Sequence, residues 1–299
     1  LPAGAFRDCT NLVAVTLPAG LKEIGAGAFT GCPNLARVSV PTLAEWYALS
    51  FADEGANPLL TGTVLYVGGI PVRLEGPRFD RLVIPEGVTR IPAGIFQGCT
   101  NFVSVTLPTS VTNIGSSAFL GCSGLTEVVV PDGVTSIGDS TFRDCNGLVH
   151  MTIPNNVTAI GSSAFSGCIG LTEVVIPPSV TNIGYSAFED CTGLVGDLSI
   201  PASVERIGQG AFRGCGGLTR VEIPACVLRT GFQNVFDVSG ITNVVMLGGV
   251  TRIGDSEFSG MWRLTGVTIP DGVTSIGDSA FSGCTGLREV ALPDGLTTI

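Results

Sequence analysis

Residues 122–145 read CSGLTEVVVPDGVTSIGDSTFRDC, a stretch that begins and ends on a cysteine. Cysteines recur at this 23-residue spacing at positions 99, 122, 145, 168 and 191, and the pair Cys9 and Cys32 has the same spacing. A fixed period of this length is typical of a solenoid, in which each coil packs only on its neighbours. The period therefore predicts the architecture before any local pattern is considered.

Each unit contains two short extended segments. After Cys122, the residues Val128 and Val130 alternate with outward-facing positions such as Glu127, which is the period-two pattern of a strand with one buried face. Pro131 ends this strand because proline has no amide hydrogen to donate. A second short strand follows and ends near Ile137, and the rest of the unit is too short for more than a helical turn.

Apolar residues of one type occupy the same position in successive units, so they predict buried columns of stacked side chains. We expect like side chains about 4.8 Å apart in neighbouring coils. The expected fold is mainly β: a right-handed solenoid with a long parallel β-sheet, short second strands and helical turns. The phenylalanine column consists of Phe6, Phe29, Phe96, Phe119, Phe142, Phe165, Phe188, Phe212, Phe258 and Phe281.

Two places depart from the repeat. Residues 42–72 form an irregular insert, in which we expect a short amphipathic helix, a tight turn at Asn57-Pro58 and a pair of strands near 65–72. The unit after Cys215 keeps its length but loses its column residues, with Val235 at the phenylalanine position and Val238 at the cysteine position. Because the spacing is preserved, we expect that unit to be a coil with a repacked interior.

Charge and length limit the kinds of partner. The 299 residues carry a net charge of −10 and contain a single lysine, so no basic stripe favours nucleic acid. No apolar run approaches the ~20 residues of a membrane span, so membrane insertion is not expected.

Both ends fall inside a repeat unit without a polar cap, so we interpret residues 1–299 as a single solenoid domain and a fragment of a longer protein.

The unit A-F-x-G-C-x-x-L-x-x-V-x-I-P-x-x-V-T-x-I-G resembles the leucine-rich repeats of the BspA-like group of surface proteins. The resemblance covers nearly the whole chain, and the pattern of the insert is similar to modules that interrupt such arrays. It implies a leucine-rich-repeat fold displayed at a cell surface or secreted, and some members of the group bind host matrix proteins or other cells. The motif is specific for the family and nearly silent about the ligand.

The ten cysteines are expected to be mostly buried thiols that act as small hydrophobic groups. Disulfides between stacked cysteines would need local distortion because parallel Cβ vectors hold the Cβ atoms near ~4.8 Å, beyond the usual range. Zinc is poorly supported because the chain has no Cys-x-x-Cys pair and only one histidine. Cys226 lies outside the cysteine column, so we expect it to be the most exposed thiol.

One outward-facing column of the long sheet collects the candidate binding residues, and we name it the outward row. Four neighbours in this row, Glu127, His150, Glu173 and Asp197, suggest a cation or ligand site. The plainer interpretation is a solvated acidic face, because side chains spaced by steps of ~4.8 Å along a row do not converge on one point. A row of threonines, such as Thr135, Thr158 and Thr181, directly follows the valine at the start of each second extended segment. This row has two interpretations: an array that orders water, or the β-propensity of threonine at a solvent-facing position. The candidate partner-binding residues are Arg37, Arg81, Glu127, His150, Glu173, Asp197 and Arg220 of the outward row, with Trp46 and Tyr47 of the insert.

Trp46 and Tyr47 have two interpretations. They can form a binding hot spot, or they can fasten the insert onto the coils, and we favour the second. No nucleotide-binding fingerprint, cofactor motif or catalytic constellation stands out from the repeat background. The sequence thus predicts a non-enzymatic extracellular or cell-surface scaffold that binds a protein. A glycan is less favoured as the ligand, because the sheet carries mixed charge and few aromatic residues. The alternative is a structural spacer that holds other domains; an enzyme ranks third.

Overall fold

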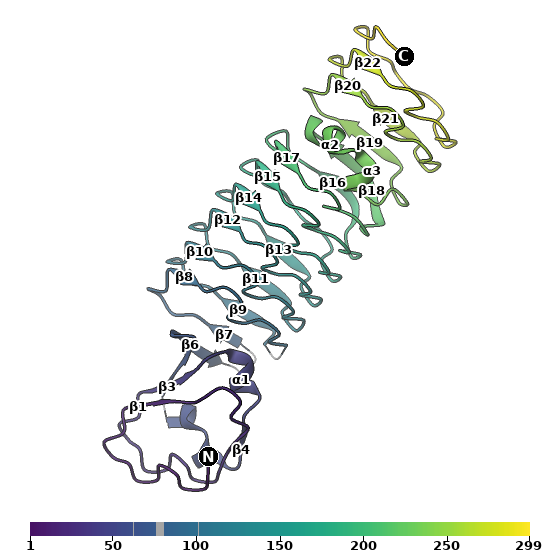
Figure 1. Cartoon of the computed structure of the whole chain (residues 1–299). Helices are drawn as coiled ribbons and strands as arrows, with labels where there is room; N and C mark the ends of the chain where they lie inside the picture. Colours follow the sequence, from purple (N-terminus) through teal and green to yellow (C-terminus); the bar gives the residue numbers. More distant parts are fainter. Residues whose placement is uncertain (62, 76–80, 101) are drawn as a thin grey trace.

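The protein is an elongated stack of coils, shown as a computed structural model in Figure 1, and its two termini lie at opposite ends of the stack. The structure describes residues 1–61, 63–75, 81–100 and 102–299. Most regular coils contribute one strand to a long sheet and one two-residue strand to the facing side. The mainly β solenoid with a parallel sheet, short second strands and turns is therefore confirmed.

The long sheet is made of two parts. Parallel strands pair in a register offset by one repeat, as in Glu127 with His150, so the outward row stacks coil on coil. The first part contains β1 (Ala14–Thr16), β3 (Arg37–Val40), β5 (Val64–Val67), β6 (Ile70–Glu75), β7 (Arg81–Val83), β9 (Ser104–Thr106), β11 (Glu127–Val129) and β13 (His150–Thr152). The second part contains β16 (Val195–Ser199), β18 (Gly217–Ile223), β19 (Asn243–Met246) and β21 (Gly266–Thr268).

The facing side carries the short second strands. Most of these strands end on an isoleucine that is followed by a glycine, and the isoleucine side chains are buried in the interior. The exceptions are β4, which ends on Phe51, and β8, in which Ile91 is followed by Pro92. The second strands are β2 (Glu23–Ile24), β4 (Ser50–Phe51), β8 (Arg90–Ile91), β10 (Asn113–Ile114), β12 (Ser136–Ile137), β14 (Ala159–Ile160), β15 (Asn182–Ile183), β17 (Arg206–Ile207), β20 (Arg252–Ile253) and β22 (Ser275–Ile276).

The long sheet is less uniform than the repeat predicts. Residues 171–178 form no strand, so the sheet is interrupted between β13 and β16. The unit between Cys191 and Cys215 is one residue longer than the others, and a β-bulge between Gly196 and Asp197 absorbs the extra residue. The expected long parallel sheet is thus present with one break, which falls in a coil whose cysteines keep the 23-residue spacing, and the bulge accommodates the longer unit that follows.

The insert contains the expected helix and strand pair. The helix α1 (Leu43–Tyr47) is followed by the 3₁₀ turns η1 (Glu54–Ala56) and η2 (Pro58–Thr61), and the Asn57 side chain accepts a hydrogen bond from the Leu59 amide (3.0 Å). Strands β5 and β6 form an antiparallel hairpin, and β6 pairs antiparallel with β7 as well. The insert therefore extends the long sheet by one reversed strand instead of leaving it.

The core is a file of stacked phenylalanine rings. Consecutive rings from Phe96 to Phe212 have centroids 5.1–5.5 Å apart and interplanar angles of 3–26°. Their side chains are almost completely shielded from solvent, as are the isoleucines of the facing side. This confirms the predicted columns and shows that each ring packs mainly on the coil before and the coil after.

The cysteine column has a polar role that the sequence reasoning missed. The Cys145 thiol donates to the Phe119 carbonyl of the preceding coil at 3.1 Å, and the Cys168 thiol donates to Phe142 at 3.0 Å. The same bond recurs along the column, at Cys32, Cys122, Cys191, Cys215 and Cys284. The Phe119 carbonyl also accepts the Cys122 amide at 3.1 Å, so a purely apolar residue at position 145 would remove one of the two hydrogen bonds that this carbonyl accepts.

The unit after Cys215 is not a normal coil. Its second strand is replaced by the helix α2 (Ala225–Thr230), and its turn by the helix α3 (Phe232–Val235). Phe236, and not the residue at position 235, continues the phenylalanine file, with its ring centroid 5.4 Å from that of Phe212. The interior of this coil is repacked as expected, but the sequence did not reveal that two helices take up the chain that a strand and a turn occupy elsewhere.

Candidate functional site

The outward row lies on the open face of the long sheet. Cross-strand register places Arg81 beside Ser104, Ser104 beside Glu127, and Glu127 beside His150. Arg81, Glu127 and His150 are exposed. Parallel pairing fixes the backbone of these residues and leaves their side chains free to project into solvent. This part of the row is therefore a flat surface of mixed charge.

Two arginines of the row, Arg37 and Arg220, are already engaged within the protein. The Arg37 guanidinium lies 4.5 Å from the centre of the Tyr66 ring, and its Nε donates to Ser39 Oγ at 3.1 Å. Arg220 donates to Glu222 Oε1 at 2.7 Å, and its other terminal nitrogen lies 3.8 Å from Asp197 Oδ2.

A small ionic network thus surrounds Arg220. Ser199 Oγ donates to Glu222 Oε2 at 2.9 Å, so the Glu222 carboxylate receives two hydrogen bonds. The hydrogen bond from the Arg220 guanidinium, followed by that from Ser199, lowers the pKa of Glu222. Asp197 and Arg220 therefore form a cluster of their own, distinct from Glu127 and His150.

The row does not form a metal centre. Glu173 is exposed but lies in the coil that makes no strand, between the two parts of the sheet. Among the described residues, no three His, Cys, Asp or Glu side chains are grouped so that they could hold a metal ion. The four candidates Glu127, His150, Glu173 and Asp197 are thus spread along the stack and do not converge.

The insert residues differ from the outward row. The Trp46 side chain is only 4% exposed, and its ring lies 5.3 Å from that of Phe51. The inclusion of Trp46 among the candidate partner-binding residues was therefore wrong, because its side chain packs into the core and fastens α1 onto the coils, as the favoured interpretation predicted. The Tyr47 side chain lies outside the part of the structure that is described.

Exposed valines accompany the charged row. Val129 is 64% exposed and Val175 is 75% exposed, each two residues beyond a glutamate of the row. Other coils carry threonine at the same position, such as Thr106 and Thr152, so the substitution to valine is a signal in the sequence. A face that combines charge with apolar side chains fits a protein surface better than a small molecule.

The threonine row on the facing side is structural. Thr158 Oγ1 donates to the Thr135 carbonyl at 3.2 Å, and Thr181 Oγ1 donates to the Thr158 carbonyl at 3.2 Å. The hydroxyl groups thus bind the backbone of the preceding coil. They are not presented as a free array for water.

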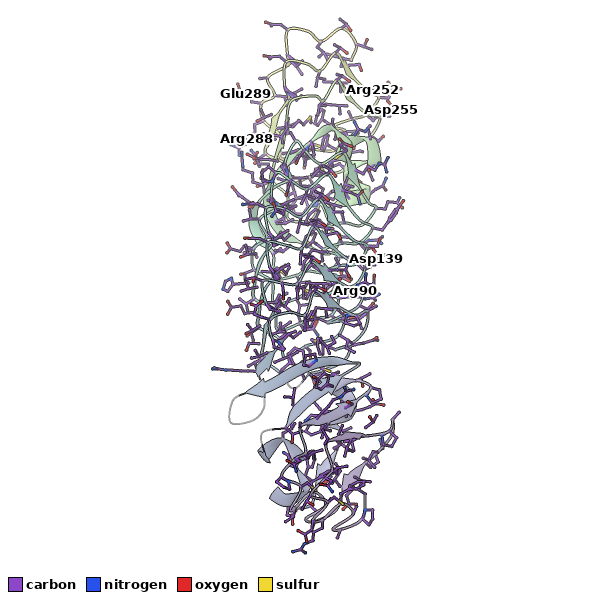
Figure 2. All side chains as sticks on the ribbon, turned by 90° about the vertical axis from the view of Figure 1, so that its left-hand side faces the viewer. Arg90, Asp139, Arg252, Asp255, Arg288 and Glu289 are labelled. Carbon is purple, nitrogen blue, oxygen red and sulfur yellow. The ribbon has the colours of Figure 1, made fainter. Side chains whose placement is uncertain are left out.

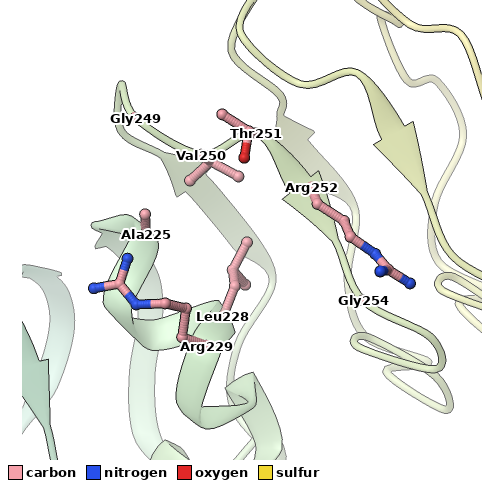
Figure 3. Close-up of a pocket in the computed structure, with 8 residues that line it drawn as sticks. All are labelled: Ala225, Leu228, Arg229, Gly249, Val250, Thr251, Arg252 and Gly254. Carbon is pink, nitrogen blue, oxygen red and sulfur yellow. The ribbon is translucent and has the colours of Figure 1, made fainter.

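Three hollows surround the irregular coil. One of about 230 Å³ lies between α2 and β20, and Figure 3 shows Leu228 and Val250 on opposite sides of it. The second, of about 340 Å³, lies beside α3 and is lined by polar side chains from Tyr185 to Asn234. The third, of about 200 Å³, adjoins the second and shares Gln233 and Asn234 with it. None of the three includes a residue of the outward row.

Thiol chemistry separates one cysteine from the rest. Cys226 is 3% exposed, so the expectation that it is the most accessible thiol was wrong: α2 buries it. Cys9 is the exposed cysteine, because the first coil leaves its thiol uncovered. Burial raises the pKa of Cys99 and of Cys215 to about 12, which keeps these thiols protonated at neutral pH.

We therefore expect one thiol, that of Cys9, to react rapidly with a disulfide reagent such as DTNB in the native protein. Cys284, at the other end of the column, is 9% exposed and should react more slowly. The remaining thiols should react only when the chain is unfolded in guanidinium. The Cys9→Ser variant should lose the rapid phase, and a rapid phase that persists in that variant would contradict the burial described above.

Comparison with known families identifies the repeat. The model of the BspA type leucine rich repeat region matches residues 1–54, 75–195 and 192–299 in six copies. The chain belongs to the BspA-type leucine-rich repeat family. The matches omit residues 55–74 of this BspA-type protein, which fall largely within the insert. Scaffolds of this family generally bind proteins and are typically non-enzymatic.

Solved structures of repeat proteins are similar to this BspA-type chain. One is a leucine rich cell surface protein from Faecalibacterium prausnitzii A2-165, with 28% identity over 96% of this chain and 81% of that one, and a TM-score of 0.40. Another is a leucine-rich repeat protein of T. pallidum, with 27% identity over 74% of this chain and 88% of that one, and a TM-score of 0.39.

A third is the pneumococcal vaccine antigen PcpA, with 17% identity over 97% of this chain and 56% of that one, and a TM-score of 0.40. No curated protein matches the sequence at a significant level. Within the described residues, the helices are all too short or too polar to cross a bilayer.

Proposed function

We propose that this BspA-type protein is an extracellular or cell-surface scaffold that binds a protein partner through the open face of its long sheet. The observation that carries this proposal is the exposed surface formed by Glu127, His150 and Glu173 together with Val129 and Val175. Protein interfaces combine a more apolar core with a polar rim, and the charges of the two partners are arranged to be complementary. Membership of the repeat family supports the same class of function and an adhesive role at the cell surface.

A charge reversal of Glu127 and Glu173 tests the proposal. The Glu127→Lys, Glu173→Lys double variant should reduce binding to immobilised matrix proteins or to intact cells by about tenfold or more, because like charges across an interface suppress association. Both side chains are exposed, so the fold should be preserved. Binding is measured by surface plasmon resonance for the matrix proteins and by flow cytometry for the cells.

The Asp132→Lys, Asp271→Lys double variant is the matched control. Both aspartates are exposed in the turns after long-sheet strands, and the change in net charge is the same. This control should bind as the parent protein does. Equal losses in the two variants would point to a non-specific charge effect, and no binding to any matrix protein or cell type would favour the spacer alternative.

A further inference from the structure

The turn edge of the solenoid changes its chemistry next to α3. In most regular coils, the residue that follows the isoleucine–glycine pair is serine or aspartate, with Ala26 in the first coil. An aspartate there accepts a backbone amide of the next coil, as Asp139 does from Ser162 (2.7 Å). In three successive coils this residue is instead Tyr185, Gln209 or Phe232. Phe232 turns into the core and is completely buried. The outer edge is left hollow where its side chain would otherwise stand.

The hollow of about 340 Å³ at this edge is lined by Tyr185, Ser186, Gln209, Arg213, Gln233 and Asn234, among others. Its backbone groups are paired between coils: the Ser186 amide donates to the Gln209 carbonyl (2.9 Å) and the Gly210 amide donates to the Asn234 carbonyl (2.7 Å). The walls are thus held by the same coil-to-coil bonds that hold the rest of the stack.

Two amide side chains are held in fixed orientations. Gln233 Nε2 donates to the Ser259 carbonyl at 2.8 Å, and Asn234 Nδ2 donates to the Thr230 carbonyl at 2.9 Å. In the described structure the oxygens Oε1 of Gln233 and Oδ1 of Asn234 accept no protein hydrogen bond. The hollow therefore offers fixed acceptors, while Gln209 supplies both a donor and an acceptor.

An aromatic ring stands at the same place. Tyr185 is 65% exposed and makes no ring–ring contact within the described part of the chain. The charge of Arg213 is partly balanced by Glu189, whose Oε1 lies 3.8 Å from its Nη1. The edge therefore combines an accessible aromatic face with uncharged polar groups, and it has little net charge to select an anion.

This combination fits a sugar ring. The C–H groups on one face of a pyranose pack on an aromatic ring, and its hydroxyl groups, each a donor and an acceptor, match fixed amide groups. A peptide would need an apolar anchor pocket, and a phosphorylated ligand would need a cluster of unpaired arginines. The adjoining hollow of about 200 Å³, which shares Gln233 and Asn234, continues the site along the edge.

We propose that the turn edge from Tyr185 to Asn234 is a binding site for a neutral oligosaccharide of at least two sugar rings. This site is separate from the outward row. Glu289 stands one repeat after Gly266 and so belongs to the column of the outward row. In Figure 2, Glu289 lies at one margin of the molecule, whereas Asp139 and Asp255, which occupy the same column of the turn edge as Tyr185, lie at the opposite margin. A saccharide and a protein partner can therefore be bound at the same time.

The test uses the whole chain and a panel of neutral oligosaccharides: cellotriose, mannotriose, xylotriose, chitotriose and lacto-N-triose. Saturation-transfer NMR identifies binding, and calorimetry measures the affinity, which should be near a Kd of about 1 mM or tighter for at least one trisaccharide. Tyr185→Ala should weaken that binding by about tenfold or more, whereas Tyr185→Phe should keep it within about threefold. Gln209→Ala should weaken it by about threefold to tenfold.

Trp262→Ala is the matched control, because Trp262 is also an exposed aromatic residue (60%) but lies outside the hollows. It should leave saccharide binding unchanged. The proposal is overturned if no member of the panel binds at about 10 mM, if Tyr185→Ala binds like the parent, or if sulfated trisaccharides added as a separate arm bind more tightly than every neutral one. The Glu127 and Glu173 charge reversal should not alter saccharide binding, so this proposal and the protein-binding proposal can fail independently.

Discussion

The Phe165→Ala variant should lose about 3–5 kcal/mol of the free energy of unfolding, the usual range for truncating a buried phenylalanine. Its ring is 1% exposed, and its centroid lies 5.5 Å from that of Phe142 and 5.1 Å from that of Phe188. Removing it opens a cavity that three coils share. Neither neighbour can close the cavity without shortening the backbone bonds between coils, for example the Phe142 amide to the Ala164 carbonyl (2.8 Å).

Urea unfolding followed by circular dichroism measures the loss, and hydrogen exchange locates it. In a repeat array each coil depends on its neighbours, so amide protection should fall most in the coils around the cavity. Phe281→Ala is the matched control: this ring is only partly buried and stacks on a single neighbour, Phe258, at 5.3 Å. A loss at Phe281 equal to that at Phe165 would show that the continuous file is not what stabilises the stack.

The Gly184→Ala variant should lose about 3 kcal/mol or more, at the upper end for overpacking, because the clash is with backbone. A Cβ atom at Gly184 would lie 2.5 Å from the Ser162 nitrogen and 2.8 Å from the Ser162 Cα of the preceding coil. Gly184 is not among the glycines with positive φ, so conformational freedom is not the reason for this glycine. The reason is the distance between coils, which leaves no room for a methyl group.

Gly121→Asn is the matched control for a glycine of the other kind. Gly121 has φ of 71°, but a Cβ there would meet nothing closer than 3.7 Å, and Asp144 occupies the same column with φ of 58°. Asparagine tolerates this left-handed conformation, so the loss should be about 1 kcal/mol or less. Thermal unfolding of both variants provides the measurement, and a Gly184→Ala protein as stable as Gly121→Asn would contradict the close approach of the coils.

The candidate site could be predicted only in part. The period placed Glu127 and His150 in adjacent coils, and the structure pairs them in register. The sequence did not reveal that Arg220 is bound to Glu222, because that contact depends on the rotamers of two side chains in one strand. For Trp46 the sequence left two interpretations open, and the favoured one, that it fastens the insert onto the coils, is the one that the buried side chain shows.

The repeat by itself determined the columns, the stacking of like side chains and the family, because a solenoid coil touches only the coils one period before and after it. Only the tertiary structure decided where the repeat fails. The bulge at Gly196 and the helices α2 and α3 with their hollows arise where the path of one coil no longer matches its neighbour, whereas the break in the long sheet falls in a coil of regular length. Such mismatches depend on the packing of whole coils against each other, which the spacing of residues along the chain does not specify.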